Sequence, residues 1–115
     1  MIAVIFEVWI NPNHKQDYLD QAGILRELLE DIDGFISVER FQSLTEADKI
    51  LSLSFFRDED AVKAWRNTIE HRKAQALGRN GYFHDYHLRI TQVIRDYGMT
   101  QRDQAPQDSK QTHRS

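Results

Sequence analysis

The residues most able to do chemistry lie in one stretch, AWRNTIEHRKAQALGR, at positions 64 to 79. It contains Trp65, Asn67 and His71 together with four cationic side chains, within about four helical turns. The imidazole of His71 titrates near neutral pH, so it can donate or accept a proton. The simpler interpretation is an amphipathic helix in which Trp65 is a core anchor, His71 lies on the surface and the cationic residues face solvent. Both interpretations stay open on this stretch alone.

A predicted break inside the stretch favours a pocket. Asn67 and Thr68 are residue types that cap helices, so the segment is predicted to form two short helices instead of one. A break there frees backbone N–H groups and the Asn67 side chain near the indole of Trp65. It also turns His71 independently of Trp65. This arrangement is typical of the lip of a pocket.

No other part of the sequence offers a competing catalytic site. There is no cysteine, which excludes disulfides, thiolate nucleophiles and thiolate-ligated metals. The sequence also lacks a glycine-rich phosphate loop, a nucleophile elbow and a His-Glu-x-x-His pair. The carboxylates of EDID and RDEDA fall at predicted helix ends, where the helix dipole explains them. We therefore expect no metal site, and any chemistry has to come from a mostly apolar pocket with few polar groups.

Charge and composition narrow the partners and the compartment. The 115 residues carry a formal net charge of -3, and no basic run lies beside interleaved aromatic residues, so nucleic acid is not an expected partner. No apolar run approaches the roughly 18 residues of a membrane span, and the start MIAVIFEVWI does not resemble a signal peptide. We expect a cytoplasmic protein that does not bind membranes.

The apolar periodicity predicts an α+β domain over residues 1–97. Period-two patterns predict strands and three-to-four spacing predicts helices. The expected elements are a strand at 2–9, a helix at 14–32, a hairpin of strands at 35–43 and 49–56, a helix capped by Asp58, and a strand at 82–97. This β-α-β-β-α-β order is that of the ferredoxin-like fold with a four-stranded antiparallel sheet. Residues 98–115 are polar and are predicted to be a disordered tail or an arm that docks on a partner.

One face of such a sheet is covered by the two helices, and the other face has no cover within the chain. That second face is predicted to be strongly apolar, which is unfavourable against water. Its expected members are Ile5, Trp9, Phe35, Phe41, Phe56, Phe83, Val93 and Tyr97. A second copy of the sheet is the simplest cover, so we expect a homodimer around a two-fold axis. The pocket itself is expected to be lined by Phe6, Phe55, Trp65 and Tyr86, a set that suits any flat aromatic molecule.

Residues 2 to 97 resemble the antibiotic biosynthesis monooxygenase superfamily of small dimeric α+β barrels. The resemblance is carried by FEVW, DGFISVERFQS, LSLSFFRDEDAVKAW, EHRKAQALGR and YHLRITQVIRDY. Its most specific matches are Trp65, which ends the third of these, and His71, which lies at the start of the fourth. The resemblance implies a ferredoxin-like dimer with a cavity between helices and sheet in each protomer.

The resemblance also implies a chemistry for the pocket. Characterised members include oxygenases that convert polycyclic phenols to quinones with dioxygen and without metal or flavin. The substrate phenolate activates dioxygen there, and the protein contributes desolvation, orientation and a proton acceptor. On that model Trp65 lines the pocket, Asn67 holds an oxygen atom, and His71 or Arg72 stabilises the phenolate. The expected substrate is a phenol, quinol or anthrone.

Two alternatives stay open. Other members of the superfamily bind and cleave haem by means of an axial histidine one turn beyond His71, but this chain has Gln75 there. The asparagine that those members carry on the first strand is also missing, because Glu7 and Val8 stand at that place. The other alternative is a dimeric small-molecule binder that catalyses nothing, since a fold does not determine a function.

Overall fold

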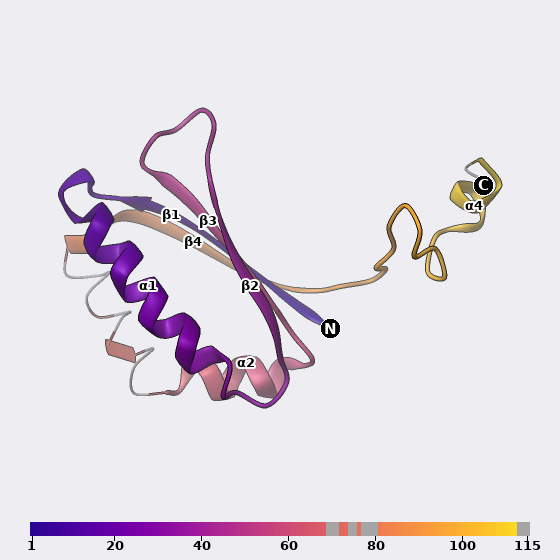
Figure 1. The fold of residues 1–115 in the computed structure, drawn as a ribbon, viewed down its shortest axis with the longest axis horizontal. Coiled ribbons are helices and arrows are strands. Elements are labelled where there is room, and N and C mark those ends of the chain that lie inside the picture. Colours follow the sequence, from indigo (N-terminus) through magenta and orange to yellow (C-terminus); the bar gives the residue numbers. More distant parts are fainter. Residues whose placement is uncertain (69–71, 74–75, 77–80, 113–115) are drawn as a thin grey trace.

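The chain forms a four-stranded sheet with two helices on one of its faces. The computed structural model describes residues 1–68, 72–73, 76 and 81–112. Its elements are β1 (Ile2–Ile10), a 3-10 turn η1 (Pro12–His14), α1 (Lys15–Leu29), β2 (Phe35–Gln42), β3 (Lys49–Phe56), α2 (Glu59–Arg66), β4 (Phe83–Gln92) and α4 (Gln107–Thr112). The strands are antiparallel, in the order β2-β3-β1-β4. Figure 1 shows α1 and α2 on the same side of this sheet. The predicted ferredoxin-like α+β fold is confirmed.

Local chemistry explains where the second helix begins and ends. Asp58 is its N-cap: the carboxylate accepts a hydrogen bond of 2.9 Å from the backbone N–H of Ala61, and this bond lowers the pKa of Asp58. The helix ends at Arg66, because Asn67 is the C-cap and its side chain donates to the carbonyl of Lys63 at 2.9 Å. The predicted break at Asn67 and Thr68 is therefore confirmed as the end of this helix, whereas most of the second short helix expected after it lies outside the described residues. The first helix ends at Leu29, three residues before the predicted end.

Alternate residues of each strand point to opposite faces, which divides the sheet into two layers. The even-numbered residues of β1 face the helices, and the core there includes Val8 and Ile10, which are 0% and 1% exposed. Pairing with β1 aligns Ile2 with Phe56 and Val8 with Ile50. The residues of β3 that face the helices are therefore Ile50, Ser52, Ser54 and Phe56.

The register of β3 corrects two assignments made from sequence. Phe55 pairs with Ala3 on the open face, away from the helices, whereas Phe56 is 1% exposed in the core. The prediction that Phe56 belongs to the uncovered face was wrong, and Phe35 and Phe83 also pack on the helix side. The cause is the pairing with β1. The register of this pairing decides which alternate residues of β3 point towards the helices, even when the residues on the other face are more apolar.

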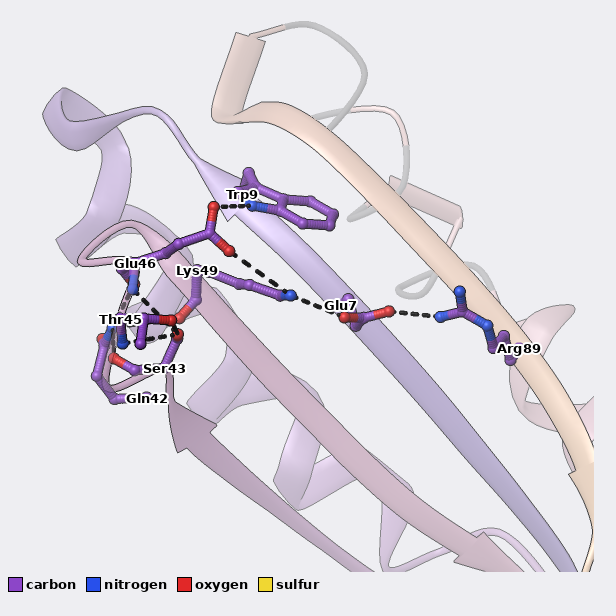
Figure 2. A network of polar contacts seen from close by, with 8 residues as sticks. All are labelled: Glu7, Trp9, Gln42, Ser43, Thr45, Glu46, Lys49 and Arg89. Carbon is purple, nitrogen blue, oxygen red and sulfur yellow. Dashed lines mark hydrogen bonds and ion pairs between the residues drawn. The ribbon is translucent and has the colours of Figure 1, made fainter.

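The open face combines apolar residues with a network of charges. Leu51, Leu53 and Phe55 of β3 and Ile5 of β1 lie on it, half-buried, and Phe41 of β2 is 42% exposed. Figure 2 shows the network, which includes Glu7, Lys49 and Arg89.

In this network the carboxylate of Glu7 binds the ammonium of Lys49 at 2.9 Å and the guanidinium of Arg89. The Lys49 ammonium also lies 4.7 Å from the centre of the Trp9 ring, and the indole donates to Glu46 at 3.3 Å. The hydrogen bonds from Lys49 and Arg89 lower the pKa of Glu7, and the bond to Glu7 raises the pKa of Lys49.

The chain beyond β4 leaves the sheet and folds on itself. Figure 1 shows this segment extending away from the body to α4. The guanidinium of Arg102 donates to Ser109 at 2.8 Å and lies 5.4 Å from the centre of the Tyr97 ring, and Ala105 is buried. The tail thus has local order, and its role as a docking arm stays a prediction. None of the helices in the described part of the chain is long and apolar enough to cross a membrane.

Candidate functional site

A cavity of about 340 Å³ lies between the helix-facing side of the sheet and the helices α1 and α2. Its size falls at the lower end of the range for small-molecule sites. The apolar part of its lining comes from Val4, Phe6, Ala22, Leu25, Leu29, Val38, Phe56, Val62, Phe83, Leu88 and Ile90. Leu88 and Ile90 remain 47% and 43% exposed, so the cavity is accessible along β4.

Aromatic rings form one end of the cavity. Phe6 of β1 lies 5.9 Å from Phe83 and 5.8 Å from Tyr86, measured between ring centres. Tyr18 of α1 packs edge-on against Phe83 at 5.6 Å and is buried. These separations are typical of attractive aromatic pairs. Phe6 and Tyr86, both predicted from sequence as pocket residues, therefore stand side by side here.

Trp65 lines the cavity from the last turn of α2. It is half-buried and packs against the core cluster that contains Phe56 and Val62. The hydroxyl of Thr68 donates to the carbonyl of Trp65 at 2.9 Å, which closes the end of the helix behind the ring. The predicted core contact and the predicted pocket position thus apply to the same side chain.

Asn67 and Arg72 are brought together at the end of α2. The Arg72 guanidinium donates to the side-chain oxygen of Asn67, while the Asn67 amide nitrogen donates to Lys63. Both residues are exposed, and neither is among the described residues that line the cavity. In this structure the Asn67 side chain closes the helix and holds Arg72.

The remaining predicted residues are separated from this group. Phe55 lies on the opposite face of the sheet. Phe56 lines the cavity instead, where Phe55 was expected. His71 and Gln75 lie outside the described residues, so the proton-transfer role of the first and the argument against haem from the second stay predictions. Within the described ranges, no three histidine or acidic side chains are grouped so that they could hold a metal ion.

The polar floor of the cavity was missed in the sequence. Arg40 of β2 pairs with Ser52 of β3, and both line the cavity together with Ser54. The two serines are each 9% exposed. Arg66, which was expected to face solvent, also reaches the cavity wall. The available signal was the alternation of Val38 and Arg40 in β2, which puts an arginine on the same face as a core valine.

Comparison with known proteins gives close relatives in sequence. The family model described as antibiotic biosynthesis monooxygenase matches residues 1–77. The chain is 50% identical over 93 residues to jasmonate monooxygenase ABM of Pyricularia oryzae, covering 81% of this chain and 43% of that protein. It is 32% identical over 94 residues to the uncharacterised protein YqjZ of Bacillus subtilis, covering 81% of this chain and 79% of that protein. The chain therefore spans less than half the length of the Pyricularia relative.

The solved structures extend this likeness to the fold. A conserved protein from Methanosarcina mazei superposes with a TM-score of 0.73 at 16% sequence identity, covering 79% of this chain and 90% of that one. An identity this low carries information about the fold alone. The family match covers most of the sheet and both cavity-forming helices, α1 and α2. The chain belongs to the antibiotic biosynthesis monooxygenase family.

Proposed function

We propose that this chain is a monooxygenase that uses dioxygen to oxidise an electron-rich aromatic molecule, of the phenol, quinol or anthrone type, without metal or flavin. The observation that carries the proposal is the cavity of about 340 Å³ beside Trp65, with aromatic rings at one end, in a chain of this family. A flat apolar substrate packs well against Phe6, Tyr86 and Trp65.

For an anthrone the reaction is balanced without any added reductant. The substrate loses a proton to give its enolate, which supplies electrons to dioxygen. The reacting CH₂ group becomes a carbonyl: one oxygen atom enters the product, and the other leaves as water with the two hydrogens of the CH₂. The protein has to exclude water, orient the ring and accept the proton. The apolar walls serve the first two tasks, and His71 is our candidate for the third.

A second substrate class is favoured by the relative in Pyricularia oryzae. That protein is named for jasmonate, which is not aromatic. The identity of 50% over 93 residues makes an alicyclic acid of similar size a reasonable substrate to test here. The lining, which is mostly aliphatic outside the aromatic end, supports a ligand of this kind.

We also propose that two copies associate through the open faces of their sheets. Ile5, Leu51, Leu53 and Phe55 form a half-buried apolar area there, and burying it against a second copy is favourable. Each cavity lies on the other side of its own sheet, so both remain accessible in such a dimer.

Oxygen consumption is the direct test. Purified protein is incubated with an anthrone or a quinol panel in an oxygen-electrode cell, with and without a metal chelator. Jasmonate is tested separately with a two-electron donor of the NADPH type, because inserting one oxygen atom into a non-aromatic ring and reducing the other to water takes two electrons that this substrate does not supply. We expect uptake of one dioxygen per anthrone oxidised, unchanged by the chelator. No uptake above the rate without protein on any substrate contradicts the proposal and favours a non-catalytic binder. A Soret shift with added haemin that is lost in His71→Ala would favour haem binding instead.

A further inference from the structure

Arg40 is a cationic residue of the cavity for which the described residues offer no partner. Its Nε–H is buried and donates to no acceptor within the described part of the chain, where its guanidinium also forms no ion pair. Arg40 as a whole is partly exposed, but a buried donor in a native protein nearly always has an acceptor, and leaving it unpaired is unfavourable. The position therefore calls for a ligand that carries hydrogen-bond acceptors.

The groups around Arg40 also favour an anion. Ser52 lies opposite Arg40 on the neighbouring strand, and Ser54 follows two residues later on the same face. No hydrogen bond of either hydroxyl is present among the described residues, although both side chains are buried. Arg66 is a second cation in the wall, and no aspartate or glutamate lines the cavity among the residues that the structure describes. The cavity is thus positively charged and has spare donors on its floor.

We propose that Arg40 binds the carboxylate of an otherwise apolar substrate, with the hydroxyl of Ser52 as a further donor. This proposal rests on the proposed function in taking the ligand of the cavity to be the substrate. A guanidinium presents parallel N–H groups that match the two oxygens of a carboxylate, whereas a phenolate has one oxygen. A single carboxylate also leaves the rest of the ligand apolar, as the walls require.

The position of Arg40 indicates how such a ligand lies. Arg40 is on the edge strand β2, and the aromatic rings of Phe83 and Tyr86 come from the opposite edge strand β4. Three strand spacings of about 4.8 Å separate these two strands. A ligand with its carboxylate at Arg40 therefore extends across β3 and β1, and its apolar body reaches Phe6 and the aromatic end. One fused ring pair or one ring with a short acid chain has suitable dimensions.

A matched pair of probes tests the assignment. Naphthalene-1-acetic acid and its methyl ester share one apolar body, and at pH 7.5 only the acid is charged. Titration calorimetry is carried out with both on the full chain and on Arg40→Met. We expect the wild type to bind the acid roughly 10- to 100-fold more tightly than the ester. In Arg40→Met the affinity for the acid should fall to that for the ester, and the affinity for the ester should stay within about twofold of its wild-type value.

Two further variants separate charge from geometry. Arg40→Lys keeps the charge but loses the forked donors, so an intermediate preference for the acid is expected. Arg26→Met removes an exposed cation from α1 outside the cavity and should leave both affinities unchanged. Binding of the ester and the far-ultraviolet circular dichroism spectrum verify that each variant is folded. If Arg40→Met does not fold, the comparison of wild type with Arg40→Lys carries the test.

Several results would overturn the proposal. These are a wild type that binds acid and ester equally or neither, an acid preference that survives in both Arg40 variants, or 1-naphthol bound as tightly as the acid with the same dependence on Arg40. Binding is measured without turnover, so the carboxylate site and the oxygenase function can be contradicted independently of each other. An acid preference that depends on Arg40 without any oxygen uptake contradicts the oxygenase and leaves the carboxylate site standing.

Discussion

The two faces of the sheet are built from alternate residues of the same strands, yet their charges are arranged in opposite ways. On the open face the carboxylate of Glu7 is paired with both Lys49 and Arg89. On the helix-facing side the Nε–H of Arg40 has no acceptor among the described residues, and Ser52 and Ser54 lie beside it in the cavity wall. A charge that is satisfied within the chain stabilises the structure, whereas an unsatisfied one in a cavity is available to a ligand.

The faces also differ in the size of their residues. In β3 the open face takes Leu51, Leu53 and Phe55, and the cavity side takes Ser52 and Ser54 between two large apolar residues. Small residues in the middle of the strand leave space under the helices, and that space is the cavity. Protein interiors are otherwise close-packed, so a gap of about 340 Å³ in the core of so small a domain indicates a place for a ligand.

The largest effect is expected from filling the cavity. Ser54→Leu puts a branched side chain into the space that the substrate occupies, so oxygen uptake on any accepted substrate should fall roughly 100-fold. The measurement is kcat/KM by oxygen electrode. Phe55→Leu, the adjacent residue on the open face, is the control and should stay within about twofold of wild type. Equal losses in the two variants would contradict the assignment of the faces.

The next effect concerns the open face. Leu53→Glu places a charge in the apolar area of each copy, where two copies would bring like charges together without a partner. We expect the dimer Kd to rise at least about 100-fold, measured by sedimentation velocity at micromolar concentration. Binding of a cavity ligand by the monomeric variant should persist. A wild type that sediments as a monomer at these concentrations would remove the basis for this face as an interface.

A smaller effect distinguishes the two tryptophans. Trp65→Phe removes the indole N–H and part of the ring from the cavity wall, and we expect kcat/KM to fall about 10-fold with little change in Tm. Trp9→Phe makes the same change on the open face, where the indole donates to Glu46, and should leave kcat/KM unchanged. If the two variants behave alike on every substrate, Trp65 has no special role in the pocket.

Most of the fold was predictable because its elements have strong local signals. The alternation in 2–9 and 82–97, the apolar stripe of the first helix and the cap at Asp58 each identified an element without tertiary information. The end of α2 at Arg66 was also predictable, since Asn67 and Thr68 favour a break. The ends of the elements were predicted less well: β4 ends at Gln92, five residues before the predicted end at 97, so Val93 and Tyr97 lie beyond the strand and not on the open face as predicted.

The cavity floor was not predictable from local signals. In 49–56 both alternating sets contain large apolar residues, and the set with Leu51, Leu53 and Phe55 is the more apolar, which favours it as the core face. Only the pairing with β1 shows that it faces outward. Arg40 was missed for a related reason: an arginine in an edge strand is usually solvated, and its place on the cavity side becomes visible only from its pairing with Ser52.

The smallest effect is expected from the charge network of the open face, because exposed ion pairs stabilise little and are screened by salt. The pKa of Glu7 is held below its ordinary value of 4.5 in the folded chain by the bonds from Lys49 and Arg89. The carboxylate therefore contributes stability above about pH 4.5, and this contribution is lost as the pH falls through the lowered pKa of the folded state. Glu7→Gln should lower Tm by about 2 °C or less at pH 7 and converge with wild type at strongly acid pH.

Glu39→Gln is the matched control, since it removes the same charge from the same face, and no ion pair of Glu39 is present among the described residues. Its Tm should follow the wild type across the pH range. The measurement is a set of thermal melts between about pH 3 and pH 7 at low and high salt, because screening should shrink the difference made by Glu7→Gln. A difference that persists below the titration of Glu7, or that is as large in Glu39→Gln, would mean that the network adds no specific stability. The comparison between the two faces would then depend only on Arg40 and the cavity, and not on the ion pairs of the open face.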